Sequence, residues 1–179
     1  MKQLLALTLI AAMLTSCSGN SSPSMPAMDP GTTAILTKDS VTEKNKATAL
    51  ASVKAFSAGK MDDAFKDATP DVVDYGDGSM KSVKGVDSIK AMVKVFLAAF
   101  PDYKGENFVV VGDGNRVAVF GDYSGTFKNA FMGMKPTGKS FKLKDVDLFT
   151  FNDAGKITEH RSVQSGATLM EMVGAKMKQ

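Results

Sequence analysis

The sequence of 179 residues contains no tryptophan, one cysteine and one histidine. A single cysteine cannot form a disulfide within the chain, so no disulfide framework holds the fold. One cysteine and one histidine also leave too few ligands for a transition-metal site, and we expect neither a metal nor another cofactor. The formal net charge of +3 is small and scattered, which argues against nucleic acid as a partner. The sequence also lacks a Walker-type loop, a Gly-x-Ser-x-Gly elbow and internal repeats.

Long apolar runs are absent after the first residues, which have the layout of an export signal. Lys2 provides a positive start, residues 4–14 are uncharged and mostly apolar, and small residues precede Cys17. The apolar run is shorter than the roughly 20 residues that span a bilayer. The pattern therefore predicts a secretory signal rather than a membrane-spanning helix.

The string Leu14-Thr15-Ser16-Cys17 resembles the lipobox of bacterial lipoprotein signals. This resemblance implies cleavage before Cys17, acylation of its sulfur and a lipid anchor in the bacterial cell envelope. An Asp after the cysteine would imply inner-membrane retention in some bacteria; Ser18 stands there, which favours the outer membrane. The alternative is an ordinary signal peptide with a chance cysteine.

The chain divides into three predicted parts. Residues 1–16 are the signal peptide, and residues 17–39 are the acylated cysteine with a linker rich in Ser, Pro, Gly and Met. Such a linker buries too little apolar surface to order itself, so we expect it to be flexible. The alternative is an ordered arm packed on the domain. Residues 40–179 form the folded domain.

The domain pattern indicates an α+β fold. Ser40 and Glu43 have capping-box spacing, which predicts a helix from Ser40 that stops near Gly59. The clearest stripe, from Ile89 to Phe100, predicts a second long helix that ends before Pro101. A short helix is expected at residues 62–67, strands at residues 72–75, 108–111, 116–127, 140–151 and 156–164, and a closing helix around residues 169–174. Helices on one face of a curved antiparallel sheet follow from this order.

Several segments together resemble the SnoaL-like polyketide cyclase family, also called the ester cyclase family. They are Ala98-Ala99-Phe100-Pro101-Asp102, Gly125-Thr126, Phe131-Met132-Gly133, Pro136-Thr137-Gly138-Lys139, Gly155-Lys156-Ile157-Thr158-Glu159 and Leu169-Met170-Glu171-Met172-Val173-Gly174. The resemblance implies the nuclear transport factor 2-like fold, in which a cone of helices is wrapped by a curved sheet around a pocket. It also implies ring closure by an acid–base carboxylate without a metal.

Three positions depart from the family pattern. The usual histidine after Gly-Thr is Phe127, the usual acid before the final helix is Ser165, and the usual tryptophan of the last strand is Arg161. A serine hydroxyl cannot replace a carboxylate near neutral pH. The family mechanism therefore cannot be transferred to this chain unchanged, which favours a domain without catalysis.

Other groups remain candidates for chemistry or binding. Strand alternation places Asp145 and Asp147 on one otherwise apolar face, where either could be an acid–base group with a raised pKa; a bulge would instead turn both to solvent. Tyr123 is a further catalytic candidate. The expected pocket-lining set is Tyr75, Phe127, Asp147, Arg161 and Ser165. By the same alternation, His160 faces away from Arg161 and is expected to be a surface or partly packed residue.

Three hypotheses follow for function. The first is a membrane-tethered, non-catalytic domain whose cone binds a small apolar or amphipathic molecule; a filled cone would contradict it. The second is a divergent cyclase, isomerase or hydrolase that acts on a small apolar carbonyl compound through Asp145, Asp147 or Tyr123. The third is an interaction platform that forms a homodimer through the open sheet face, which requires exposed apolar side chains there.

Overall fold

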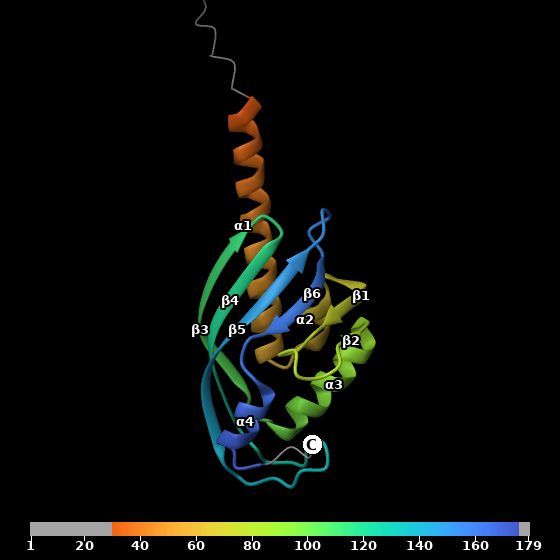
Figure 1. The fold of residues 1–179 in the computed structure, drawn as a ribbon, viewed down its shortest axis with the longest axis vertical. Coiled ribbons are helices and arrows are strands. Elements are labelled where there is room, and N and C mark those ends of the chain that lie inside the picture. Colours follow the sequence, from red (N-terminus) through yellow and green to blue (C-terminus); the bar gives the residue numbers. More distant parts are fainter. Residues whose placement is uncertain (1–29, 176–179) are drawn as a thin grey trace, which may run out of the picture.

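The computed structural model describes residues 30–175, with side chains from Lys38 onward. Four helices are present in this range: α1 (Pro30–Ser57), α2 (Met61–Phe65), α3 (Val86–Ala99) and α4 (Gly166–Met172). The strands are β1 (Ala68–Asp74), β2 (Val83–Lys84), β3 (Lys104–Asp113), β4 (Arg116–Thr126), β5 (Ser140–Phe151) and β6 (Ile157–Ser162). Figure 1 shows the long β3–β5 strands curving beside α1, with α3 and α4 toward the other end.

The six strands form one sheet in the order β2-β1-β6-β5-β4-β3. Neighbouring strands are antiparallel except β1 and β6, which run parallel. The predicted α+β architecture, with N-terminal helices, a curved sheet and a C-terminal helix, is confirmed. The sheet is mixed rather than entirely antiparallel, because β1 comes from the helical half of the chain and joins the edge of the later meander.

Helix α1 begins at Pro30, so the predicted start at Ser40 is wrong. A proline suits the first turn of a helix, and residues 32–57 contain neither glycine nor proline to interrupt it. Thr42 of the apparent capping box lies inside the helix, where its hydroxyl donates to the Lys38 carbonyl at 2.9 Å and accepts from the Gly114 N–H at 2.9 Å. Thr42, within the apparent capping box, therefore docks α1 on the turn between β3 and β4.

The predicted signal and Cys17 lie outside the described residues, as do Ser18 and the linker before Pro30. Residues 30–39, predicted as part of that linker, belong to α1. None of the helices in the described part of the chain is long and apolar enough to cross a membrane.

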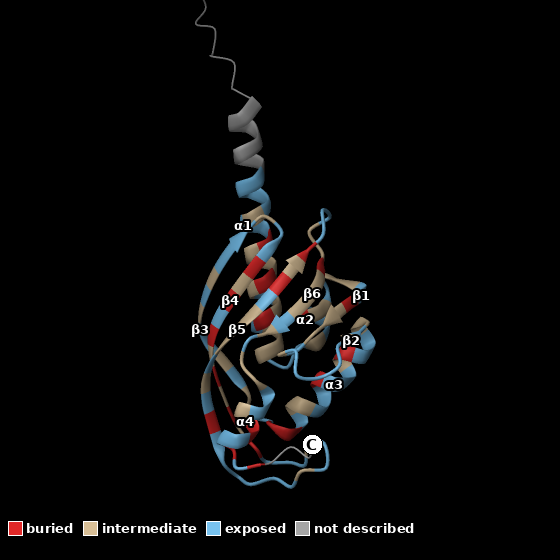
Figure 2. Cartoon of the chain, in the orientation of Figure 1, coloured by how far each residue is buried: buried red, intermediate tan, exposed pale blue. Residues whose placement is uncertain are grey.

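The core lies between the helices and the concave face of the sheet. Ile89, Val93 and Phe100 of the predicted stripe are buried there. Figure 2 shows buried segments in red on both the helices and the strands. Helix α3 ends before Pro101, as predicted. Gly59 follows α1 with φ at 70°, a conformation that glycine adopts without strain, so the predicted stop is confirmed.

Candidate functional site

Strand β5 carries the two candidate carboxylates on the concave face of the sheet. Its pairing with β4 is continuous from end to end, so no bulge changes its alternation. Phe141, Phe149 and Phe151 are buried on the same face, and Asp145 and Asp147 are half-buried between them. The predicted common face is confirmed, and both acids point toward the interior.

Asp147 is the centre of a chain of polar contacts. The Tyr123 hydroxyl, from β4, donates to Asp147 Oδ2. On the other side, His160 Nε2 lies 3.0 Å from Asp147 Oδ1, and His160 Nδ1 lies 3.2 Å from Asp74 Oδ1. Asp74 Oδ1 also accepts from the Gly76 N–H at 2.8 Å. Side chains from four strands thus form one connected chain.

The chain of polar contacts from Tyr123 to Asp74 is partly exposed to solvent at the end that holds His160. The His160 side chain is 27% exposed, Asp147 is 17% exposed and Asp74 is 12% exposed. Tyr123, in contrast, is buried. Asp147 is therefore the point where the buried tyrosine and the partly exposed part of this polar chain meet.

The ionisation of the chain follows from its contacts. Burial by itself lowers the pKa of His160, but the hydrogen bonds and charges of Asp147 and Asp74 outweigh this effect and raise it to about 10. Burial raises the pKa of Asp74, yet the contact with His160 brings the net value below the ordinary one. At neutral pH an imidazolium thus lies between two carboxylates.

Two tyrosines approach the same carboxylates from the core side. Burial first, and then the charge of Asp147, raise the pKa of Tyr123, so its hydroxyl stays protonated. Burial likewise raises the pKa of Tyr103 well above 10, with further contributions from Asp147 and Asp145. The two rings are stacked with centroids 6.0 Å apart. Both phenols therefore stay protonated, and the Tyr123 hydroxyl donates to Asp147.

Asp145 has a different environment from Asp147. Its Oδ1 accepts from the N–H groups of Val146, Val163 and Gln164, and its Oδ2 accepts from the Ser162 hydroxyl at 2.6 Å. Burial raises the pKa of Asp145, and these bonds oppose the rise. The carboxylate is thus occupied in holding the segment between β6 and α4.

The structure corrects the predicted orientation of β6. Arg161 is exposed and pairs with Leu148 on the outer face, where its guanidinium lies 3.9 Å from the centroid of the Tyr75 ring. The prediction that Arg161 lines the cone is wrong. Phe151 pairs with Ile157 but Thr150 pairs with Glu159, so a bulge shifts the alternation and His160 faces inward instead.

The two positions that usually carry the family's acid–base groups, Phe127 and Ser165, have packing and capping contacts here. Phe127 is fully buried, and its ring stacks on Phe100 with centroids 5.3 Å apart. Ser165 is the N-cap of α4, where its hydroxyl accepts from the Ala167 N–H at 3.1 Å. Of the expected pocket-lining residues, only Asp147 belongs to the polar chain. His160, Asp74 and Tyr103 were not identified as site residues from the sequence.

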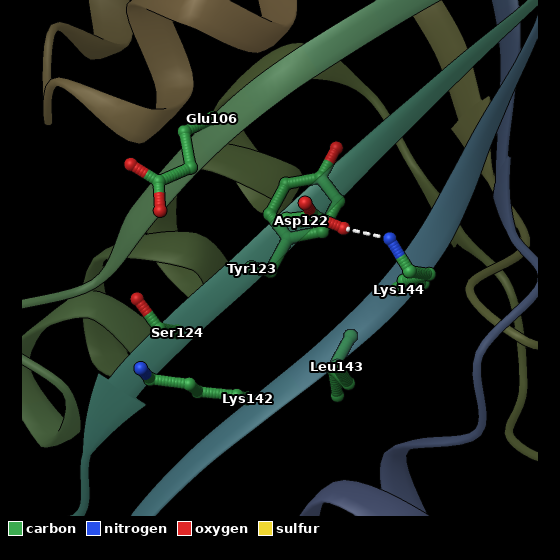
Figure 3. Close-up of a pocket in the computed structure, with 7 residues that line it drawn as sticks. All are labelled: Glu106, Asp122, Tyr123, Ser124, Lys142, Leu143 and Lys144. Atoms are coloured by element: carbon green, nitrogen blue, oxygen red, sulfur yellow. Dashed lines mark hydrogen bonds and ion pairs between the residues drawn. The ribbon is translucent and has the colours of Figure 1, made fainter.

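Two hollows of the described residues open at the surface. One, of about 360 Å³, is lined by Glu106, Asp122, Tyr123, Ser124, Lys142, Leu143 and Lys144. Figure 3 shows it beside the Asp122–Lys144 ion pair of 2.7 Å on neighbouring strands. The other, of about 450 Å³, lies at the start of α3 beside Ala68 and Pro70. Neither includes Asp147 or His160, and no group of residues in the described range is arranged to hold a metal ion.

Comparisons with known proteins agree with this architecture. A sequence model described as SnoaL-like polyketide cyclase matches residues 46–172. A structure of AclR, a putative hydroxylase from Streptomyces galilaeus, is 28% identical with a TM-score of 0.63, and the match covers 74% of this chain and 97% of that one. A putative SnoaL-like polyketide cyclase from Jannaschia sp. CCS1 is 25% identical with a TM-score of 0.67, covering 76% and 96% of the two chains.

More distant structures share the fold. IdmH, a putative polyketide cyclase from Streptomyces antibioticus, is 23% identical with a TM-score of 0.61, and the match covers 73% of this chain and 99% of that one. No curated protein matches the chain. The family match spans most of the sequence and includes every strand of the sheet. The chain therefore belongs to the SnoaL-like polyketide cyclase family.

Proposed function

We propose that the domain is an acid–base enzyme that removes and returns a proton beside the carbonyl group of a small apolar compound. The observation that carries this proposal is the Asp147 carboxylate, which is accessible to solvent yet held by both Tyr123 and His160. A general base needs such a fixed geometry within reach of the substrate. A buried charge destabilises a fold unless an opposite charge lies beside it. The His160 ring is the positive partner of Asp147.

The chemistry assigns distinct roles to the groups. The Asp147 carboxylate takes the proton from the carbon next to the carbonyl, and the C–H electron pair moves into an enolate. The Tyr103 hydroxyl, whose raised pKa keeps it protonated, donates to the developing oxygen anion. Reprotonation, or attack of the enolate on a second carbonyl of the same molecule, completes an isomerisation or a ring closure.

Proton exchange tests this proposal without a known substrate. A panel of small ketones, β-diketones and β-keto esters is incubated with the domain in D₂O, and deuterium at the α-carbon is followed by NMR. Asp147→Asn should lower the exchange rate about 10²- to 10⁴-fold, the usual contribution of a general base. Asp122→Asn, on the outer face of β4, is the matched control. Exchange that is equal in parent and Asp147→Asn contradicts the proposal.

The second candidate is a non-catalytic binding domain. It is favoured by Phe127 and Ser165, because the positions that carry acid–base groups in the family serve packing and helix capping here. This candidate predicts a small apolar or amphipathic molecule that is released from the purified domain on denaturation and detected by mass spectrometry. It also predicts no deuterium exchange with any compound of the panel.

The proposed location of this activity rests on the lipobox-like residues before Cys17. We infer that lipid on Cys17 tethers the domain to a membrane of the bacterial cell envelope, with the outer membrane favoured by Ser18. Labelling with a radioactive fatty acid should mark the parent and not Cys17→Ala. Membrane fractionation then identifies which membrane holds the protein. A Cys17→Ala form that stays in the membrane fraction contradicts the tether.

The outer sheet face is the proposed contact between two copies of the domain. Val109, Val111, Phe120 and Leu148 are exposed there, and Val109 pairs directly with Phe120 across neighbouring strands. An exposed apolar surface of this kind suits an interface. Phe120→Asp should convert the dimer to a monomer in sedimentation, whereas Val41→Asp on α1 should not. A parent that is monomeric at high concentration contradicts the dimer.

A further inference from the structure

The role of Asp147 as the base does not account for the two contacts that His160 makes. The ring lies on β6, between Asp74 on β1 and Asp147 on β5, and each ring nitrogen is within 3.2 Å of one carboxylate oxygen. A neutral imidazole has one donor and one acceptor, while a carboxylate only accepts. Both contacts are hydrogen bonds only if both ring nitrogens carry a proton. Two acidic side chains, one at each ring nitrogen, therefore favour an imidazolium, in agreement with the raised pKa of His160.

No other charged side chain recorded in the described residues contacts the ring. Asp74 from β1 and Asp147 from β5 are the two charged groups that contact it, and the Phe149 ring lies 5.1 Å away by centroid. Beyond Asp147 the chain continues to the neutral Tyr123 hydroxyl. The cluster thus combines one positive and two negative charges, and loss of either carboxylate leaves a simple ion pair.

Asp74 is itself held in place. Its Oδ1 accepts from the Gly76 N–H, and the Tyr75 N–H donates to the His160 carbonyl at 3.0 Å. The backbone at the end of β1 therefore fixes both the carboxylate and the strand that carries the histidine. Asp147, in contrast, takes its recorded hydrogen bonds within residues 38–175 from two side chains, those of Tyr123 and His160.

We propose that Asp74 and His160 are a positioning pair, which holds the Asp147 side chain turned so that it accepts the hydrogen bond of the Tyr123 hydroxyl. The proposal rests on the proposed function in one respect, namely that Asp147 is the reacting carboxylate. Neither Asp74 nor His160 takes the substrate proton. The Asp74 charge keeps the His160 ring protonated. The ring then fixes Oδ1 of Asp147. Oδ2 of Asp147 accepts from the Tyr123 hydroxyl and faces the substrate.

The experiment uses the fact that His160 is the only histidine of the chain. Its ring signals in ¹H–¹⁵N NMR spectra therefore need no further assignment. We expect the signals of a doubly protonated ring from pH 6 to pH 9 in the parent. In Asp74→Asn the titration midpoint of the ring should fall by about 1–3 pH units, the usual effect of a neighbouring opposite charge. Asp71→Asn, an exposed acid of the same strand, should leave it unchanged.

The Tyr123 hydroxyl supplies a readout that a merely structural ion cluster would not move. Its proton, shared with Asp147, should give a downfield signal in the parent and in Asp71→Asn. This signal should be lost or shifted in Asp74→Asn, and Asp74→Glu should restore it. If Asp74→Asn does not fold by circular dichroism, His160→Gln serves as the second variant and should also lose the Tyr123 signal.

The outcomes separate this pair from the proposed enzyme. An ordinary, neutral His160 in the parent at pH 8, or a Tyr123 signal unaffected by Asp74→Asn and His160→Gln, overturns the positioning pair. Parent protein that exchanges no α-proton, with the NMR results as expected, overturns only the proposed function. With turnover present, Asp74→Asn should lower kcat at an unchanged KM, and its alkaline loss of rate should move with the His160 midpoint. A rate profile identical to the parent's overturns the pair.

Discussion

Phe127→His restores the residue that the family usually carries at this position, and we expect it to destabilise the domain. Phe127 is 0% exposed, and its ring stacks on Phe100 within the apolar buried cluster. The substitution loses an aromatic contact of about 0.5–1.5 kcal/mol. It also buries ring N–H and nitrogen groups without partners, which costs about 1–3 kcal/mol. The free energy of unfolding should therefore fall by about 3 kcal/mol.

Urea unfolding followed by circular dichroism measures this loss from the midpoint at a constant slope. Phe120→His is the matched control, because Phe120 is 44% exposed on the outer face and the change there should be within about 0.5 kcal/mol. A Phe127→His domain as stable as the parent would refute the reasoning. It would mean that the cone has space and polar partners at this position, and the family's acid–base site could then be rebuilt.

Two further predictions concern stability. The pKa of His160 is about 10 in the fold against 6.5 for the free side chain, so its stabilisation is complete below pH 6.5 and is lost as the pH rises through about 10. The stability difference between parent and His160→Gln should shrink by no more than about 5 kcal/mol over this interval, measured by urea unfolding at each pH; a constant difference contradicts it. Gly121→Ala should cost about 1–3 kcal/mol, because its Cβ would lie 2.9 Å from the Tyr123 ring and 3.0 Å from the Phe108 ring. Thermal unfolding checks this, and Gly166→Ala is the control for loss of a glycine, because its nearest neighbour, Asp77 Oδ2, would lie 3.9 Å from the added Cβ.

Most of the fold could be predicted because its signals are local. The stripe from Ile89 to Phe100 gave α3 within a few residues, and the residues 140–151 gave β5 with its inward face. The short strand β2 was missed, since two residues carry no periodicity. The start of α1 was misplaced because Ser40 and Glu43 have the spacing of a capping box, although no helix breaker precedes them within residues 32–39.

The candidate site was only half predictable, since its members meet through strand pairing rather than sequence spacing. Asp145, Asp147 and Tyr123 were found because β4 and β5 alternate without interruption. Asp74 belongs to β1, which pairs in parallel with β6. The two strands are far apart in the sequence, so no turn motif between them predicts this pairing. The polar environment of Asp147 therefore depends on contacts between residues as distant as Asp74 and His160.

The bulge at the start of β6 decides the charge of the site. Continuous alternation from Ile157 would place Glu159 and Arg161 beside Asp147, and the guanidinium is permanently charged. The extra residue turns His160 inward and leaves Arg161 stacked on Tyr75 at the surface. An imidazolium donates one N–H to each of two carboxylates and can still be discharged above pH 10, whereas an arginine cannot. The bulge in β6 thus places His160, a titratable cation, at the centre of the site. A prediction from alternation alone assigned Arg161 to this place for the same reason.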